Sequence, residues 1–308
     1  MQITYRYRIK DKHASRLKAQ AQAANFVWNY CNEIQQKAIR DHHRWLTGYD
    51  LWKLVAGCTK EGLDLHSHSA MRVCMQYERS RRQHKKPWLR WRSQKSLGWV
   101  PFNTGHVQFR DGGFIFRGER YDVWLHRFLP EGAKIGACSF SQDARGHWYI
   151  NCPVEIEEAV QATLKYVGID LGLKDFATLS TGKKIDAPQL YRKSEAKLAI
   201  SQRARKNKRM RAIHAKIGNR RRDFLHKESN KISKEYGLVV IGDVSPSRLA
   251  QTNMAKSVFD AGWSRFRNML SWKLRLRSGG MLLEVSERLT SQVCSECGSL
   301  PPSRPRGI

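Results

Sequence analysis

Acidic side chains are scarce in this chain of 308 residues: 27 Asp and Glu stand against 56 Lys and Arg, which gives a formal net charge of +29. The chain also lacks an apolar run of about 18 residues, which argues against a transmembrane helix. The opening residues MQITYRYRIKDK carry charges where a signal peptide needs an apolar stretch, which argues against secretion. The basic stretches have no sustained apolar face, so a membrane surface is disfavoured as a partner. The charge therefore predicts a polyanionic partner, above all a nucleic acid.

Spaced cysteine pairs are equally scarce. The chain has 7 cysteines, of which Cys294 and Cys297 form the only CxxC pair and the others stand singly. Scattered single thiols are typical of a reducing compartment, so we expect a cytoplasmic protein. Structural zinc takes four ligands in a tetrahedron, and neither Cys nor His follows Cys297 in the sequence. By itself the pair is half of a zinc site.

The first half of the chain changes from helical to strand patterns. Residues 2–9 alternate apolar and polar side chains as a strand does, and apolar residues recur at helical spacing from about residue 12 to residue 95. Between residues 99 and 156, short alternating runs are separated by Gly, Asp and Pro, which predicts antiparallel strands. We therefore expect residues 1–158 to form a β-barrel with a helical insertion at about 12–95.

The end of this insertion mixes basic and aromatic residues. Several Lys and Arg lie between residues 79 and 95, interleaved with two tryptophans. Such mixing suits a surface that neutralises phosphates and stacks on bases or sugars. The alternative is a solvated helix face followed by a loop that the tryptophans anchor. The candidate nucleic-acid contacts are Trp88, Arg90, Trp91 and Arg92.

The second half predicts a mixed α/β sheet. LKYVGIDLG (164–172) is an apolar run that ends in a carboxylate, and DFATLSTGKKI (175–185) pairs with it as a hairpin. Hairpin, crossover helix and further strands are compatible with an RNase H-like domain at residues 159–308. The fold class is thus a multidomain protein, α+β and α/β. The other expected elements are a polar helix at 190–235, a buried strand at 237–244, a helix at 255–278 and a strand at 279–285.

Asp170 is the first candidate catalytic residue. Its carboxylate ends an apolar strand between Gly168 and Gly172, and small neighbours let a metal ion and a phosphate backbone approach closely. Nucleases of the RNase H fold hold two Mg²⁺ ions about 4 Å apart with several carboxylates, so Asp170 is a candidate Mg²⁺ ligand. The alternative for a lone Asp at a strand end is a turn residue or a helix cap.

Residues 201–222, expected to be one helix, carry many cations and no acid. A structural helix normally mixes both signs to gain i,i+4 pairs. An unrelieved positive face predicts a phosphate track along a guide RNA or an RNA–DNA duplex; the alternative is a solvated arm. The candidate contacts are Arg203, Arg205, Lys206, Lys208, Arg209, Arg211, Lys216, Arg220, Arg221 and Arg222.

Four segments occur in a specific order. They are YRYRIKDKHASRLKAQAQAANFVWNYC, VGIDLGLKDFATLSTGKKI, KNKRMRAIHAKIGNRRRDFLHKESNKI and TSQVCSECG. In turn they resemble the opening strand and helix, the first catalytic motif, the basic helix and the TSQxCSxCG segment of the TnpB family, the OrfB proteins of bacterial insertion sequences. Because the ordered combination is far more specific than any one segment, the chain is identified as a member of that family, without its C-terminal end.

The resemblance implies an RNA-guided DNA endonuclease. Its fold would be a wedge-like N-terminal barrel with a helical recognition insert, then a RuvC-like nuclease domain with an incomplete zinc ribbon at 290–308. Its partners would be a guide RNA derived from the element and a target double-stranded DNA, in the cytoplasm of a bacterium and at its nucleoid. Its chemistry would be Mg²⁺-dependent hydrolysis of a phosphodiester.

The resemblance also marks departures from the family. The second family carboxylate, a Glu, corresponds here to Gly242. Asp243, one residue on, or Glu287, just past the next strand, could replace it, and we favour Glu287, which stands where many relatives have proline. Glu284 is a weaker candidate because it lies in mid-strand. The alternative is that these three are ordinary surface acids.

The third family carboxylate, an Asp that follows a second CxxC, has no counterpart before Ile308. With only Cys294 and Cys297 present, Zn²⁺ binding is doubtful, and we expect poor cleavage or none. Two alternatives stay open. The chain could be a nuclease-inactive RNA-guided DNA binder, acting as a repressor or left as a decayed remnant, or a basic DNA-binding protein that uses no guide.

Overall fold

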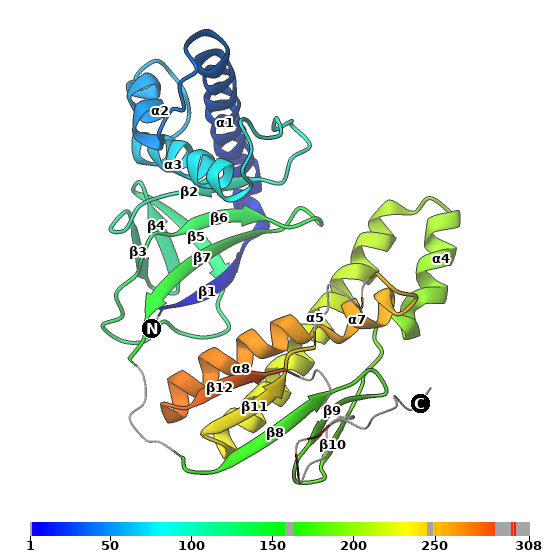
Figure 1. Cartoon of the computed structure of the whole chain (residues 1–308). Coiled ribbons are helices and arrows are strands. Elements are labelled where there is room, and N and C mark those ends of the chain that lie inside the picture. The colour runs from blue at the N-terminus through cyan, green and yellow to red at the C-terminus, as the bar shows by residue number, and fades with distance from the viewer. Residues whose placement is uncertain are drawn as a thin grey trace. The chain divides into compact units, whose positions relative to one another are not determined.

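The structure is a computed structural model that describes residues 2–157, 163–244, 249, 251–286, 297 and 299. The chain divides into two compact units, residues 1–156 and 157–308, which are described in turn (Figure 1). Among the described residues, each helix is too short or too polar to cross a bilayer.

Unit 1 combines three helices with a seven-stranded antiparallel sheet. The strand order is β2-β6-β7-β1-β5-β4-β3, so the N-terminal strand β1 lies between β7 and β5. Its helices are α1 (Ala14–His42), α2 (Gly48–Val55) and α3 (Ser67–Gln83), with a 3-10 turn η1 (Asp11–His13) before α1. Its strands are β1 (Gln2–Ile9), β2 (Trp99–Pro101), β3 (Val107–Arg110), β4 (Gly113–Phe116), β5 (Glu119–Trp124), β6 (Ser139–Gln142) and β7 (Trp148–Glu155).

Aromatic side chains from both halves of this sheet meet in one core. Phe102 follows the edge strand β2, and its ring centroid lies 4.5 Å from that of Phe116 in β4 and 4.9 Å from that of Phe140 in β6. All three rings are buried. Since β2 and β4 are far apart in the strand order, the sheet curls so that its inner face encloses these rings.

Unit 2 is built on a five-stranded mixed sheet of order β10-β9-β8-β11-β12. Strands β8, β9 and β10 form antiparallel hairpins, whereas β11 is parallel to both β8 and β12. The strands are β8 (Tyr166–Leu171), β9 (Asp175–Leu179), β10 (Lys184–Asp186), β11 (Leu238–Gly242) and β12 (Met281–Val285). The helices are η2 (Arg192–Ser194, 3-10), α4 (Glu195–Arg203), α5 (Asn207–Glu235), α7 (Ala255–Ala261) and α8 (Trp263–Ser278).

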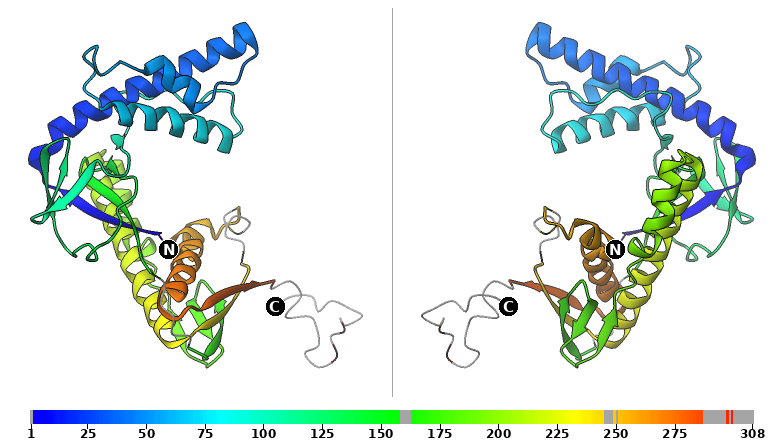
Figure 2. Two further views of the ribbon diagram at one scale, coloured as in Figure 1. Left: turned by 90° about the vertical axis from the view of Figure 1, so that its left-hand side faces the viewer. Right: turned by 90° about the vertical axis from the view of Figure 1, so that its right-hand side faces the viewer.

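Parallel pairing requires crossover connections, and helices supply them here. Helix α5 lies between β9–β10 and β11 in the chain, and α7 and α8 lie between β11 and β12. Helices α5 and α8 pack side by side on the sheet (Figures 1 and 2). Leu225 of α5 and Phe266 of α8 share a core with Ile169 and Ile241 of the sheet. One face of the sheet is therefore buried under helices.

Two helices expected from the sequence are each interrupted. The basic helix predicted over 201–222 breaks after Arg203, because residues 204–206 form a turn in which Arg205 takes a φ of 50°. The helix predicted over 255–278 breaks at Gly262, whose φ is 71°. A left-handed residue stops the i→i−4 ladder. Both predictions of a continuous helix were therefore wrong, although the flanking segments are helical.

Candidate functional site

Asp170 lies on the face of the sheet that the helices leave open. It is exposed near the end of β8, whereas its neighbours Ile169 and Leu171 are buried. In the ladder it lies opposite Thr178 of β9. Because side chains alternate along a strand, Asp170 points away from the core that α5 and α8 cover, and this places its carboxylate at the surface.

The strand register identifies the residues beside Asp170. Ile169 lies opposite Ile241 of β11, so the next step of the parallel ladder sets Gly242 beside Asp170. Gly242 in turn lies opposite Val285 of β12. The position on β11 beside Asp170 is therefore a glycine and offers no side chain.

Two further acids lie near this part of the sheet, Glu284 in β12 and Asp243 just after β11. Glu284 lies opposite the buried Ile241, and its carboxylate is 3.1 Å from the guanidinium of Arg267 in α8. Asp243 directly follows the last residue of β11; it is exposed, and its backbone N–H donates to the carbonyl of Val285 at 2.8 Å. Glu284 is therefore held on the face that α8 covers, away from Asp170.

Two of the predicted metal ligands, Glu287 and Cys294, lie outside the described residues. Cys297 is exposed, with its Sγ 2.9 Å from the Oγ of Ser299. Over the residues that the structure describes, no three His, Cys, Asp or Glu side chains group so as to hold a metal ion. The described residues alone therefore do not complete a two-ion site around Asp170.

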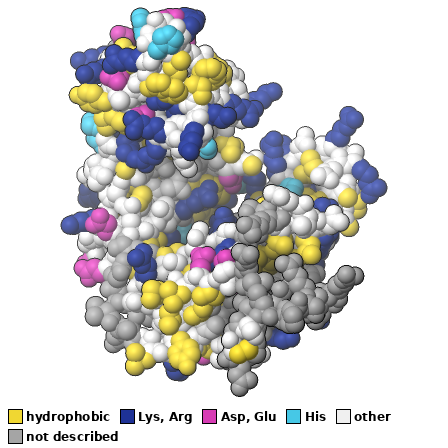
Figure 3. All heavy atoms as spheres, viewed as in Figure 1, with side chains coloured by type: hydrophobic (Ala, Val, Ile, Leu, Met, Phe, Trp, Pro, Cys, Tyr) yellow, Lys and Arg dark blue, Asp and Glu magenta, His cyan; other side chains and the backbone are white. Residues whose placement is uncertain are grey.

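The cations of 203–222 form the most distinctive surface of unit 2. Nine of the ten predicted contacts are exposed; none of the nine lies within ion-pair distance of an acid in the part of the chain that is described. They lie on α4, on the turn after it and on the first half of α5. Figure 3 shows Lys and Arg side chains gathered on the lobe that these helices form. We call these nine the α4–α5 cations: Arg203, Arg205, Lys206, Lys208, Arg209, Arg211, Lys216, Arg220 and Arg222.

Arg221 is the exception among the ten. Its guanidinium lies 2.6 Å from the carboxylate of Asp260 in α7, and Asp260 also accepts the backbone N–H of Tyr191 at 2.7 Å. Asp260 is only 6% exposed, and the Arg221 side chain 23%. The pair therefore ties α5 to α7, and in this structure Arg221 is committed to the fold rather than presented to a ligand. The sequence signal that could have found it is Asp260, the single acid between residues 244 and 283.

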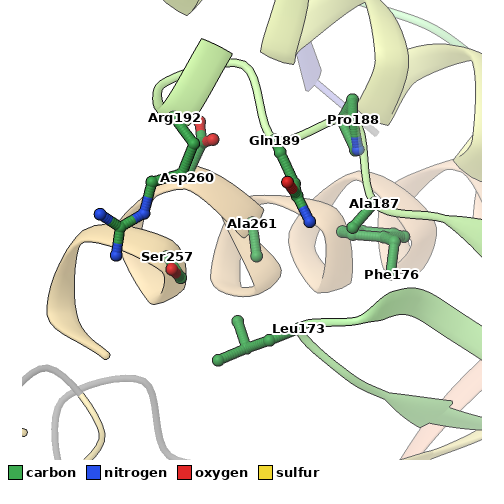
Figure 4. A pocket seen from close by; sticks show the side chains of 9 residues that line it. All are labelled: Leu173, Phe176, Ala187, Pro188, Gln189, Arg192, Ser257, Asp260 and Ala261. Carbon is green, nitrogen blue, oxygen red and sulfur yellow. The ribbon is translucent and has the colours of Figure 1, made fainter. Parts of the chain in front are cut away.

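Asp260 also borders a small pocket beside the β8–β9 turn. The cavity is about 140 Å³. Figure 4 shows Leu173 and Phe176 on one side of it, and Ser257 and Ala261 of α7 on the other. Since the Asp260 carboxylate is already neutralised by Arg221, the pocket carries no free charge from that residue, and its walls are mainly apolar.

In unit 1 an extended segment is fastened along α1 by asparagine side chains. Asn32 accepts the N–H of Leu89 at 2.8 Å and donates to the Leu89 carbonyl at 2.9 Å. Asn29 does the same for Arg92, at 2.8 Å each way. These bonds hold residues 89–92 at two points one helical turn apart. The segment is therefore ordered by α1 although it has no regular secondary structure.

The fastened segment displays two of the predicted aromatic contacts. Trp88 and Trp91 are each 49% exposed, and Arg90 is exposed between them. Arg92 differs, because its guanidinium carbon lies 3.9 Å from the ring centroid of Trp28 and 5.3 Å from that of Trp99. Burial lowers the pKa of Arg92. Arg92 thus anchors the segment between two rings and is not an open cation.

Comparison with known proteins places these features in a class. Residues 150–253 match the family model described as a probable transposase, and residues 263–306 match the model described as the TNB domain of Cas12f1-like proteins. The fold and the basic surface accordingly define an α+β protein of the transposase-associated class. The chain belongs to the TnpB family.

Two curated relatives and one solved structure are similar to this chain. A putative RNA-guided DNA endonuclease of Streptomyces pristinaespiralis is 35% identical over 234 residues, 70% of this chain and 58% of that protein. The putative RNA-guided DNA endonuclease InsQ of Escherichia coli is 31% identical over 183 residues, 50% of this chain and 45% of that protein. The chain thus spans about half the length of these relatives.

The solved structure is that of a Cas12f1–sgRNA–target DNA complex. It matches with a TM-score of 0.57 at 13% identity, over 95% of this chain and 76% of that one. At this level of identity the likeness concerns the fold, which is an α+β fold of the kind found in Cas12f1.

Proposed function

We propose that this chain acts as a TnpB-like, RNA-guided DNA-binding protein and endonuclease. The observation that carries the proposal is the set of α4–α5 cations, which are exposed and have no acidic partner among the described residues. They lie in the same unit as a sheet that presents Asp170 at its open face. Unpaired cations destabilise one another unless a polyanion neutralises them. The names of the curated relatives agree in kind, since both are called RNA-guided DNA endonucleases.

Each unit has a part in this proposal. Residues 1–158 would be a wedge-like barrel with a recognition insert at about 12–95, supported by the curled sheet around Phe102 and by the exposed Trp88 and Trp91. Residues 159–308 would be a RuvC-like domain with an RNase H-like sheet, supported by the strand order with a parallel β8–β11–β12 core. The aromatic rings would stack on unpaired bases, while the α4–α5 cations would follow phosphates.

The partners would be a guide RNA derived from the element and a target double-stranded DNA. In such systems base pairing reads the sequence, and the protein contacts the backbone of the RNA–DNA duplex. A group of exposed Lys and Arg side chains suits contact with the phosphate backbone. The guide would thus supply sequence specificity, and the protein would supply affinity through charge contacts with the phosphates.

The catalytic part of the proposal rests on Asp170. A bound divalent ion such as Mg²⁺ would stabilise charge on a scissile phosphate, and Asp170 is the described residue that would hold it. Glu287 is our proposed second ligand, ahead of Asp243. For Zn²⁺ we propose no complete site, because Cys294 and Cys297 supply two ligands where four are needed.

A test combines binding and cleavage on the same samples. Purified chain is mixed with RNA transcribed from its own element and with a plasmid that carries the matching target, with Mg²⁺ or with EDTA. We expect the protein to bind the plasmid only when the RNA is present. We also expect cleavage that needs Mg²⁺ and disappears in Asp170→Asn. The control is Asp175→Asn, an acid of β9 that pairs with Lys184 at 3.4 Å.

The other outcomes separate the alternatives. RNA-dependent retention without cleavage would leave a nuclease-inactive binder and remove the catalytic part of the proposal. Retention that does not depend on RNA, and that falls steeply with salt, would overturn the whole proposal in favour of a basic DNA-binding protein that uses no guide.

A further inference from the structure

A groove runs between α5 and the segment formed by η2 and α4. Its volume is about 220 Å³. One wall is a stripe of α5 at i, i+3, i+4 and i+7, which begins at Ile213 and ends at Arg220. The other wall has the same spacing, from Leu190 to Lys197. Side chains at this spacing lie on one face of an α-helix, so the α5 residues form a stripe along the groove. Opposite this stripe lie Leu190 in the turn before η2, Lys193 and Ser194 of η2, and Lys197 of α4.

The floor of the groove is apolar. Ile217 is buried, Ile213 is half-buried, and Leu190 faces them from the other wall. Aliphatic side chains that stay partly open to solvent gain free energy when a flat apolar group covers them. The floor therefore favours a ligand with an apolar face.

The rim of the groove is cationic. Lys193 and Lys197 stand on one wall, Lys216 and Arg220 on the other, and all four are exposed. No acid lines the groove as far as the structure describes it. The acid nearest in sequence, Glu195, is engaged by Arg192 at 3.2 Å and by Lys256 at 2.6 Å. The rim therefore favours a ligand with anionic groups on either side of its apolar part.

A nucleotide has this combination, with a flat base between charged phosphates. In a duplex the base is stacked and paired, so only an unpaired strand can offer it to a floor of aliphatic side chains. Ser194 also lines the groove, and its hydroxyl donates to the Leu190 carbonyl at 2.9 Å. Its oxygen keeps lone pairs that can accept a hydrogen bond from a ribose 2′-OH.

We propose that this groove binds one unstacked nucleotide of an unpaired RNA segment, with the base on Ile213 and Ile217 and the flanking phosphates on the four cations. The proposal rests on the proposed function, since it assumes that the protein binds RNA. It adds a defined subsite that holds a single base, in contrast to the phosphate track formed by the other α4–α5 cations.

The test uses a short single-stranded RNA with one 2-aminopurine, whose fluorescence rises when the base leaves a stack. The full chain is titrated with this RNA at low salt. We expect a rise of about 3-fold on binding to the unaltered chain, and none with the same strand in a duplex. In Ile213→Asn, which keeps every charge, we expect the rise to be lost and binding to weaken by about 5-fold.

A matched pair of double variants separates the groove from general charge. Lys216→Gln with Arg220→Gln removes one Lys and one Arg from the rim. Lys208→Gln with Arg211→Gln removes the same charges from α5 outside the groove. We expect both to lower RNA affinity to a similar degree, but only the first to abolish the fluorescence rise. Thermal melting shows whether each variant is folded. If Ile213→Asn does not fold, the two double variants still decide the test.

Several results would contradict the proposal that the groove binds a nucleotide. RNA binding without a fluorescence rise would exclude the base subsite and leave the proposed function standing, whereas no RNA binding at all would remove the proposed function itself. An equal loss of the rise in both double variants would also exclude the groove. An equal rise with single-stranded DNA would overturn the assignment to RNA. An unchanged preference for RNA over DNA in Ser194→Ala would overturn the contact between Ser194 and the ribose 2′-OH.

Discussion

The two halves of α5 use their charges in different ways. In the first half, residues 207–222, most cations are exposed and have no acidic partner among the described residues. In the second half, residues 223–235, Lys227 pairs with Asp223 and Lys231 with Glu228, each at 2.8 Å. The second half also buries Leu225 and other side chains against the sheet. The second half therefore stabilises the fold, whereas most cations of the first half make no ion pair or core contact within the described residues that would stabilise it.

The boundary between the halves is a run of three arginines. Arg220 and Arg222 are exposed, whereas Arg221 is turned toward α7 and pairs with the buried Asp260. Successive residues of a helix point about 100° apart, so neighbours with the same side chain reach different surroundings. The comparison teaches that residue type predicts a basic helix, but helix phase decides which of its cations a ligand can reach.

The largest expected effect comes from breaking the boundary pair. Asp260→Asn leaves Arg221 without its partner in a partly buried place, and we expect the free energy of unfolding of unit 2 to fall by about 3 kcal/mol. Arg220→Ala, one residue away but exposed, should change it by less than about 0.5 kcal/mol. Urea titrations of both variants measure the difference. Equal losses in the two variants would contradict the division of α5.

The next effect concerns the first half of the helix. Replacing Lys208, Arg209, Arg211 and Lys216 together by Gln should weaken RNA binding by about 30- to 100-fold near physiological salt. The slope of log affinity against log salt should become shallower by about 3, because each lost phosphate contact removes about 0.7 from it for a single strand. Fluorescence anisotropy at several salt concentrations gives both numbers. An unchanged slope would show that these cations do not contact phosphates.

The pH dependence of stability tests the packing of α8 on the second half of α5. Burial lowers the pKa of Lys273 in α8 from its ordinary 10.5 to about 8, and its ammonium donates to the His226 carbonyl at 2.7 Å and to Ser229 at 2.8 Å. The folded state disfavours the charged form, so the cost of burying it is full below pH 8 and vanishes above 10.5. Stability of unit 2 should therefore rise with pH across that window, by about 2 kcal/mol.

Other groups titrate in the same pH window, so the quantity to measure is the difference in stability between the unaltered chain and a variant without this lysine. Lys273→Met keeps the length of the side chain and removes the titration. Its stability between pH 8 and pH 10.5, followed by urea unfolding, should lack the component that Lys273 adds. If the two proteins change in parallel, the buried lysine does not contribute to the pH dependence.

The smallest expected effect compares two glycines. Gly262 has a φ of 71°, and an added Cβ would lie 3.3 Å from Cδ of Arg221 and 3.4 Å from Cδ1 of Leu225. Gly262→Ala should therefore cost about 1 kcal/mol. Gly218, in the interior of α5, has nothing within 4 Å of an added Cβ, so Gly218→Ala should stabilise by about 0.5–1 kcal/mol. Thermal melting that gives the same sign for both would contradict this contrast.

Local patterns predicted much of the secondary structure. The alternation in residues 2–9 and the turn signals after residue 99 correspond to β1 and to β2 through β7. The predicted hairpin after Asp170 is present as β8 and β9. These elements depend on side-chain periodicity and on turn residues, both of which are visible in one dimension. The helix breaks were missed because Arg205 and Gly262 interrupt patterns that otherwise continue across them.

The site divides in the same way. The sequence by itself determined the excess of cations, their concentration in 203–222 and the position of Asp170 at the end of an apolar strand, because composition and periodicity are properties of neighbouring residues. The tertiary structure decided that Gly242 lies beside Asp170, that Glu284 faces α8, and that Arg92 and Arg221 are anchors. Those facts depend on strand register and on contacts between residues far apart in the chain, and no local pattern encodes such contacts.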